Sequence, residues 1–401
     1  MTNRRDNMVY DERGVSSTKE EVHKAVEKLD AGLFPGAFCK IIPDCLVNDP
    51  DYCILMHSDG AGTKAALAYM AWREGLISTE EAWEKIQWDS LVMNWDDAGC
   101  AGAVGPFIIN STINRNKLLI SGDVIAAIIS GCQKAADFLT SLGMPCTFAG
   151  GETADVGDLV RTITVDNTIV CRMRRDQIID ASRIVPGDVM VGFSSTGQAV
   201  WETEENSGIG SNGFTNGRHD MLSHIYAKRY PETFSPEMKS GLVYRGKFYL
   251  NDPLPGDERF TILSALLSPT RTYLPLIKKL IENLPLGSIH GFIHCSGGGQ
   301  TKIKKFGRQG NLYVKNDLFP LPPVFQELKN ATGITWQEMY RVYNMGHRLE
   351  AVMSSISSAQ TCIAIAEECG IEAQIIGERV RATDGPANTV IIESKFGEFV
   401  Y

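Results

Sequence analysis

The residues from Asp59 to Lys64, Asp-Gly-Ala-Gly-Thr-Lys, combine groups that could bind a phosphate together with a metal ion. Backbone N–H groups in a glycine turn that opens a helix can bind an anion. The carboxylate of Asp59 can coordinate a metal, and the ammonium group of Lys64 can pair with a phosphate. Because the order G-x-x-x-x-G-K-[ST] is absent, this is not a Walker A loop. The segment therefore indicates another kind of phosphate-handling site.

Two flanking runs predict the elements that position this turn. The apolar residues 53–56 before it are typical of a strand, and residues 65–70 after it are typical of a helix. On the residues alone, an ordinary strand-to-helix turn with an exposed lysine remains the alternative.

A second candidate is the acidic pair Asp96 and Asp97, which ends the apolar run 91–95. Carboxylate oxygens are the ligands that Mg²⁺ takes together with substrate phosphates. If the run is a strand, adjacent side chains point to opposite faces, so we expect only one acid to reach the site. The alternative is that one of the two caps the following helix.

Two further glycine segments follow expected strands. Residues 150–153, Gly-Gly-Glu-Thr, come after a short expected strand at 146–149, and Glu152 offers another oxygen ligand. Residues 297–299 are three glycines after an expected strand at 288–294, an arrangement that fits a second anion-binding turn. Plain glycine turns are the alternative for both segments.

Two other patterns predict no site. Residues 208–213 satisfy G-x-G-x-x-G, but they follow an acidic polar stretch, so the condition for a dinucleotide fingerprint is not met. His290 and His294 lie four apart in an alternating, strand-like run, and no further ligands occur at zinc-site spacing. We therefore expect structural histidines.

The composition limits the class of protein. The chain has 401 residues and a net charge of −9, which argues against sequence-independent nucleic-acid binding. The ten cysteines include no C-x-x-C pair, so we expect reduced, buried thiols in a cytoplasmic protein. We found neither a secretory signal nor an apolar run long enough to span a membrane.

The length predicts two or three domains. We expect an extension at 1–50 with one helix at 18–29, an N-terminal domain at 51–180, a C-terminal domain at 181–390 and a tail at 391–401. A strand is expected at 189–193, and residues 231–255 resemble an excursion rich in turn formers. Helices are expected at 123–142, 272–282, 322–332, 335–343 and 358–369.

Taken in order, these segments resemble the aminoimidazole ribonucleotide synthetase (phosphoribosylformylglycinamidine cyclo-ligase) family, from about residue 10 to residue 377. The family's D-G-V-G-T-K corresponds to residues 59–64, and its G-G-E-T-A matches residues 150–154 unchanged. Its E-M-Y-R-x-x-N-x-G is kept at 338–346. Further matches are V-N-D…G-A at 95–103, S-S-G…S-N-G-Y at 194–214, L-x-P-T-R-x-Y at 267–273 and T-G-G-G at 296–299.

The resemblance implies an α/β protein of two mixed domains. Its reaction would be the ATP-dependent cyclisation of formylglycinamidine ribonucleotide to aminoimidazole ribonucleotide, with ADP and phosphate released, in purine biosynthesis. In the family, the N-terminal domains of two subunits pair their sheets into a shared barrel, which implies a homodimer. The implied cofactor is Mg²⁺, with ATP as co-substrate.

The resemblance also implies site residues. Asp59, Asp97 and Glu152 would hold the metal, and Asp59, Lys64 and Asp97 would be catalytic. The implied ATP-binding residues are Lys28, Gly60, Gly62, Thr63, Gly150, Gly151, Glu152 and Thr153. The implied ribonucleotide-binding residues are Ser211, Asn212, Gly213, Gly297, Gly298, Gly299 and Asn344.

The chain departs from the family at two notable places. The histidine of the family's S-S-G-P-H-S-N-G is missing, and an insertion at 198–210 stands in its place. Residues 302–305 replace the usual E-N-I-P-R after the triple glycine. Two alternatives therefore remain: another ATP-dependent amide- or phosphate-activating member of the superfamily, and a non-catalytic ATP-binding regulatory paralogue.

Overall fold

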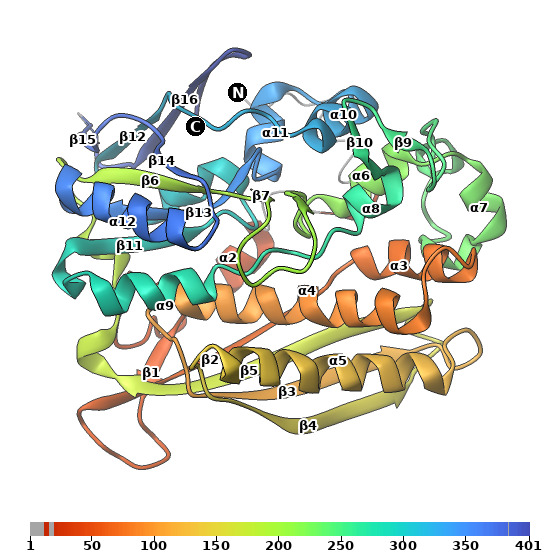
Figure 1. Ribbon diagram of the computed structural model, residues 1–401, viewed down its shortest axis with the longest axis horizontal. Coiled ribbons are helices and arrows are strands. Elements are labelled where there is room, and N and C mark those ends of the chain that lie inside the picture. Colours follow the sequence, from red (N-terminus) through yellow and green to blue (C-terminus); the bar gives the residue numbers. More distant parts are fainter. Residues whose placement is uncertain (1–11, 16–19, 384) are drawn as a thin grey trace.

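The strand expected before the glycine turn is β2 (Tyr52–Gly60), and the helix after it is α3 (Lys64–Arg73). The computed structural model describes residues 12–15, 20–383 and 385–401 (Figure 1). β2 belongs to a five-stranded mixed sheet of order β1-β2-β5-β3-β4, in which only β3 and β4 are parallel neighbours. The other strands are β1 (Ile41–Pro43), β3 (Phe107–Arg115), β4 (Cys146–Asp155) and β5 (Ile163–Arg174).

Helices cover one face of this sheet. Burial alternates along β3 and β5, which is the pattern of strands packed on one side only. The covering helices are α4 (Thr79–Cys100) and α5 (Gly122–Ser141), and they lie between the sheet and the rest of the molecule (Figure 1). The helix expected at 123–142 is thereby confirmed as α5.

The strand expected around residues 91–97 was wrong, because these residues lie in α4. Ser78 caps this helix by accepting a hydrogen bond from the N–H of Glu81 at 3.0 Å. The helix packs on the sheet on one side and on α9 and β11 on the other, so nearly all of its last four turns are buried. A helix buried all round has no amphipathic period, and its apolar runs resemble those of a buried strand.

The strand expected at 146–149 is longer than predicted, because β4 continues through the glycines to Asp155, and the alternative of a plain glycine turn at 150–153 was wrong. The pairing register between β3 and β4 shifts between Ile109 and Ser111, so β4 carries a bulge at its glycines. A Cβ on Gly151 would lie 1.9 Å from the carbonyl oxygen of Ser111. Close approach of β3 therefore requires glycine at position 151.

The second half of the described chain contains two four-stranded sheets. The first has the order β11-β13-β6-β14 and is antiparallel, and the second has the order β15-β12-β16-β17. Helices α9 and α12 pack on the first sheet (Figure 1). Bounds are β6 (Val189–Ser194), β11 (Ile289–His294), β13 (His347–Met353), β14 (Ala373–Ile375), β12 (Asn311–Lys315), β15 (Arg381–Ala382), β16 (Thr389–Ser394), β17 (Gly397–Val400), α9 (Leu274–Asn283) and α12 (Ile356–Glu368).

Most helices expected in this half are present within two residues of their expected bounds. The tail expected at 391–401 instead forms most of β16 and all of β17, so it is part of the second sheet.

The helix expected at 18–29 corresponds to α2 (Glu20–Val26), and its expected cap, Ser17 or Thr18, lies outside the described residues. The remaining α-helices are α6 (Phe214–Met221), α7 (Ile225–Arg229), α8 (Ile262–Leu266), α10 (Pro323–Thr332) and α11 (Trp336–Val342).

Short elements complete the described chain. The strands are β7 (Thr196–Gly197), β8 (Asn206–Ser207), β9 (Pro253–Leu254) and β10 (Asp257–Thr261). The 3₁₀ helices are η1 (Arg175–Gln177), η2 (Ala181–Arg183), η3 (Pro231–Thr233), η4 (Ser240–Leu242), η5 (Leu286–Ser288) and η6 (Gly299–Lys305). Within the described ranges, no helix combines the length and apolar character needed to cross a membrane. All ten cysteines are free thiols, and all but Cys45 and Cys146 are buried, as predicted.

The insertion at 198–210 is tied to the fold. Glu202 forms an ion pair with the buried guanidinium of Arg271 at 2.6 Å. The side-chain amide of Asn206 donates to the carbonyl of Pro269 at 2.6 Å, and the hydroxyl of Ser207 donates to that of Ala265 at 2.7 Å. These buried contacts give the insertion a fixed position against the segment before α9.

Candidate functional site

The glycine turn of the Asp59–Lys64 segment opens onto a cleft between the two halves of the molecule. We call this the interdomain cleft; its volume is about 500 Å³. On one side are Gly62 and Thr63 with residues 161–166 of β5 and the loop before it, and on the other is α6 with Thr215 and Arg218. The hydroxyls of Thr63 and Thr215 are 2.9 Å apart and link the two sides.

The local geometry of the turn suits an anion. Gly62 has φ +59°, and a Cβ there would meet no atom within 4 Å, so the backbone faces open space. No side chain caps the amino end of α3, and its first turn holds no acidic residue. Both features leave the positive end of the helix dipole directed at the cleft. Gly60 matters for another reason, since a Cβ there would lie 1.9 Å from the carboxylate of Asp166, which would have to move.

Lys64 was expected to pair with a phosphate, but its side chain does not reach this cleft. Its side chain is fully buried and forms an ion pair with Asp89 of α4 at 2.9 Å. Its ammonium group also donates to the carbonyl of Ser268 at 2.6 Å. Burial lowers the pKa of Lys64, while the Asp89 charge opposes that shift. In this geometry Lys64 joins the two halves of the molecule and is not positioned to hold a phosphate.

The two adjacent acids on α4 have different partners. Asp96 is fully buried and accepts hydrogen bonds from the hydroxyl of Thr272 at 2.6 Å and from the N–H groups that begin α9. Asp97 accepts from Nδ1 of His294 at 2.5 Å, and its other oxygen lies 3.6 Å from Nε2 of His57. Asp96 thus caps α9 and not the helix that follows it in the sequence, so the capping alternative was wrong in that form. Asp97 remains the candidate metal ligand.

Asp97 is held in its ionised form. Burial opposes ionisation, but the hydrogen bond from His294 and the positive charges of His294, His57 and Lys302 outweigh it, so the pKa of Asp97 lies below its ordinary value. His57 was missed in the sequence, and His294 was expected to have only a structural role. His57 lies two residues before Asp59, within the strand that leads to the turn, and this proximity was the available signal.

Asp59 and Asp97 lie in the same region. The side-chain amide of Asn94, one turn before Asp97 on α4, donates to the carbonyl of Asp59 at 3.0 Å. Burial raises the pKa of the Cys39 thiol, and the negative charges of both Asp97 and Asp59 add to this effect. Both carboxylates therefore lie within electrostatic reach of Cys39, in the region beside the end of β2.

Glu152 does not join them within one chain. It is exposed on the edge strand β4, three strand steps from β2, which is roughly 14 Å. Its register partner Thr112 is on the face of the sheet that the helices leave open. Gly150, Gly151 and Thr153 lie on the same strand. Lys28 follows α2 and is exposed.

The residues expected to bind the ribonucleotide lie around Tyr343. Gly213 begins α6 with φ +69°, and a Cβ there would lie 2.5 Å from the Tyr343 ring. A Cβ on Gly299 would lie 2.6 Å from the Tyr343 carbonyl. Asn344 uses its amide within the protein, because its oxygen accepts from Ser195 and its nitrogen donates to Gly208. Gly213 and Gly299 thus pack on the segment that contains Tyr343 and Asn344. The other residues expected to bind the ribonucleotide are Ser211 and Asn212, which precede α6, and Gly297 and Gly298, which precede η6.

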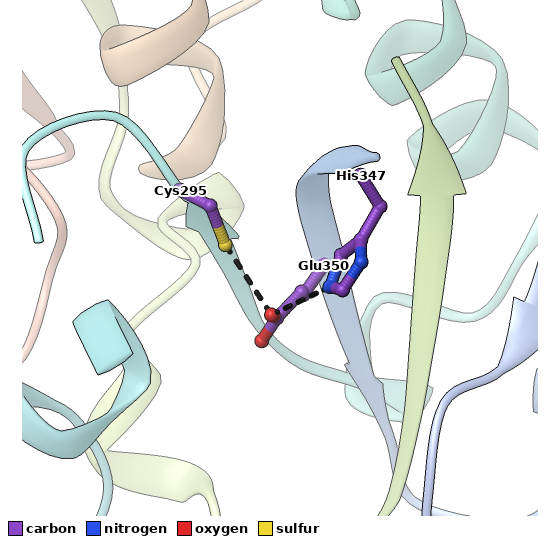
Figure 2. A group of neighbouring side chains, drawn as sticks. All are labelled: Cys295, His347 and Glu350. Carbon is purple, nitrogen blue, oxygen red and sulfur yellow. Dashed lines mark hydrogen bonds and ion pairs between the residues drawn. The ribbon is translucent and has the colours of Figure 1, made fainter. Parts of the chain in front are cut away.

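A buried polar cluster lies behind the triple glycine. Cys295 and His347 both contact the same oxygen of Glu350, at 3.3 and 3.1 Å (Figure 2). These three groups have the spacing of metal ligands. However, the buried ammonium of Lys315 also binds that oxygen and supplies the positive charge. Burial and the charge of Glu350 raise the pKa of the Cys295 thiol well above its ordinary value, so the cluster is better described as an ion pair than as a metal site.

This ion pair predicts a pH dependence of stability. Burial opposes ionisation of Glu350, but the charges and hydrogen bonds of Lys315 and His347 lower its pKa to about 2 from an ordinary 4.5. Its stabilising contribution is therefore present above about pH 4.5 and is lost as the pH falls toward 2. The measurement is the free energy of unfolding against pH, compared with a Lys315→Met/Glu350→Gln double variant. An equal slope in both proteins over this range would contradict the prediction.

The fold and the cleft define a mixed α/β protein with a helix-opening glycine turn at a cleft between its two halves. Residues 42–173, which span the five-stranded sheet nearly end to end, match the family model described as "AIR synthase related protein, N-terminal domain". Proteins named phosphoribosylformylglycinamidine cyclo-ligase are similar over most of the chain. The one from Methanocaldococcus jannaschii is 26% identical, covering 85% of this chain and 82% of that protein; the one from Alkaliphilus metalliredigens is 27% identical, covering 94% of each.

Solved structures share the fold at low identity. A structure titled "AaThiL complexed with AMPPCP and TMP" has a TM-score of 0.51 and 12% identity, covering 95% of each chain. T. maritima PurL complexed with FGAR has a TM-score of 0.50 and 14% identity, and 98% of this chain covers about half (54%) of that one. The family-model match and the similarity to cyclo-ligases over most of the chain confirm the resemblance to the AIR synthetase family found in its motifs.

Proposed function

We propose that this protein is an ATP-dependent cyclo-ligase that converts formylglycinamidine ribonucleotide to 5-aminoimidazole ribonucleotide in purine biosynthesis, acting in the cytoplasm. The observation that carries the proposal is the glycine turn on the interdomain cleft, in a chain whose cyclo-ligase relatives match it over most of both lengths. ATP would phosphorylate the amide oxygen, the amidine nitrogen would close the ring, and phosphate would leave. Such chemistry depends mainly on positioning and charge stabilisation.

Asp59 and Asp97 are the residues that would hold Mg²⁺. Their carboxylates lie in the same region and Asp97 is ionised, which fits a hard cation that prefers oxygen ligands. The bound ion would neutralise charge that develops on the transferred phosphoryl group. The backbone of Gly60, Gly62 and Thr63 would hold phosphate oxygens at the amino end of α3.

A homodimer is part of the proposal. The helix-free face of the five-stranded sheet carries a row of Met56, Val170 and Ile108, which are register partners across three strands. Met56 and Ile108 are 62% and 52% exposed, and apolar side chains gathered on an open sheet face favour association. Two copies paired through these faces would bury this row, and Glu152 on the same face would then lie at the interface.

We expect a Met56→Arg/Ile108→Arg double variant to be a monomer where the wild-type protein is a dimer. Two buried charges at the centre of the paired faces would oppose association. Sedimentation equilibrium at micromolar concentrations measures this. Val200→Arg, which changes an exposed residue of the C-terminal half, serves as the control and should not change the mass. A monomeric wild-type protein would refute the proposal.

The activity is tested by incubating purified protein with formylglycinamidine ribonucleotide, ATP and Mg²⁺. The aminoimidazole product is detected by diazo coupling, and ADP is measured in parallel. Product formation that requires both ATP and Mg²⁺ is the expected result. ATP binding without product would instead favour the non-catalytic paralogue, a possibility motivated by the missing family histidine and by the buried pairing of Lys64.

A further inference from the structure

Arg218 is a buried cation on the wall of the interdomain cleft. It lies in α6, five residues after the αL glycine Gly213, and only 2% of its surface is exposed. Thr63 lies across the same cleft, at the amino end of α3. The guanidinium is therefore close to open space while being almost entirely removed from solvent.

The guanidinium group has fewer acceptors than its five N–H donors require. Its Nη1 donates to the hydroxyl of Tyr244, and its Nε, which is buried, has no hydrogen-bond partner. Its Nη2 lies 3.4 Å from Nε2 of His219, whose Nδ1 lies 3.3 Å from the N–H of Tyr244. Burial and the charges of Arg218 and Arg13 lower the pKa of His219 to about 2, so this ring is neutral. A neutral imidazole has one acceptor, so only one of the two contacts can be a hydrogen bond.

Within the part of the chain that the structure describes, the charge of Arg218 is also uncompensated. The nearby carboxylate of Asp220 is shared by Arg13 and Arg245, each at 2.5 Å. Glu232, which lines the cleft, accepts from the hydroxyl of Tyr69 at 2.6 Å. No carboxylate of the described ranges pairs with Arg218. Burial and the charge of Arg13 lower its pKa to about 9, which leaves it protonated at neutral pH.

An unpaired buried charge is costly, and a bound anion relieves that cost. We propose that Arg218 binds a phosphate group of the ligand in the interdomain cleft, opposite the amino end of α3. A guanidinium matches the oxygens of a phosphate, and the hydroxyls of Thr63 and Thr215 offer further donors nearby. The inference rests on the proposed function and deepens it, because it assigns the phosphate of a phosphorylated substrate to a named residue.

The test measures thermal unfolding with and without millimolar inorganic phosphate, at constant ionic strength set with sodium chloride. Phosphate should raise the Tm of the wild-type protein. Arg218→Met should lose this response and bind phosphate at least about tenfold more weakly, because it lacks the charged hydrogen bonds. In phosphate-free buffer its Tm should not fall below that of the wild type, since an uncompensated charge has been removed. Should Arg218→Met fail to fold, Arg218→Gln keeps donors for Tyr244 and serves the same comparison.

Arg245→Gln is the matched control, because Arg245 pairs with Asp220 and does not line the cleft. It should keep the phosphate response. Ribose 5-phosphate and ATP are tested in the same way. If Arg218→Met binds only ribose 5-phosphate more weakly, Arg218 binds a sugar phosphate; if it binds only ATP more weakly, Arg218 binds a nucleotide phosphate. Equal phosphate responses in the wild type and Arg218→Met, or none in the wild type, would overturn the inference. A phosphate response that depends on Arg218, in a protein without cyclo-ligase turnover, would leave the inference standing and remove the proposed function.

Discussion

Asp97→Asn should lower cyclo-ligase turnover by at least about a hundredfold, because one metal ligand supplies several kcal/mol of transition-state stabilisation. The asparagine oxygen can still accept the hydrogen bond that His294 makes at 2.5 Å, so the variant should fold. The measurement is steady-state aminoimidazole formation at saturating ATP across a range of Mg²⁺ concentrations. The apparent affinity for Mg²⁺ should fall together with the rate.

Asp137→Asn is a suitable control for this experiment. Asp137 lies on the exposed side of α5, where it accepts a hydrogen bond from Gln133 at 2.9 Å. Its turnover should equal that of the wild type. If Asp97→Asn folds and turns over normally, the assignment of Asp97 to the metal is wrong.

Lys64→Met should lower the free energy of unfolding by about 3–5 kcal/mol, because it leaves the carboxylate of Asp89 buried without its cation. The carbonyl of Ser268 also loses its donor. Urea unfolding of the variant and the wild type measures the difference. A loss of activity in any Lys64 variant must therefore be separated from a loss of folded protein.

A double variant makes this prediction sharper. Asp89→Asn keeps the oxygen that accepts from the N–H of Thr270 at 2.7 Å, and it removes the negative charge. Combined with Lys64→Met, it should be more stable than Lys64→Met alone. A fully additive loss in the double variant would show that the two side chains do not interact.

The strand and helix around the Asp59–Lys64 turn could be predicted because an apolar run, a glycine turn and a helix-forming run follow one another there. The helix α4 could not be predicted, because it is buried from both sides and its sequence has no amphipathic period. The bulge in β4 was mistaken for a turn because Gly150 and Gly151 break the strand pattern in either case.

The site was only partly predictable for a related reason. Motif order correctly indicated the resemblance to the family, and the metal-ligand roles of Asp59 and Asp97 remain predictions. It could not show what each side chain contacts. Lys64 is bound by Asp89 on another element, and His294 is brought to Asp97 from about two hundred residues away. Such pairings depend on tertiary packing, which a single sequence does not encode in a local pattern.

The position of α4 has a consequence for motion. One helix packs on the five-stranded sheet below and on α9 and β11 above (Figure 1). A hinge rotation that separates the two halves would pull Asp96 from the start of α9 and expose the pair of Lys64 and Asp89 to water. Rigid-body separation of the two halves for substrate entry is therefore costly.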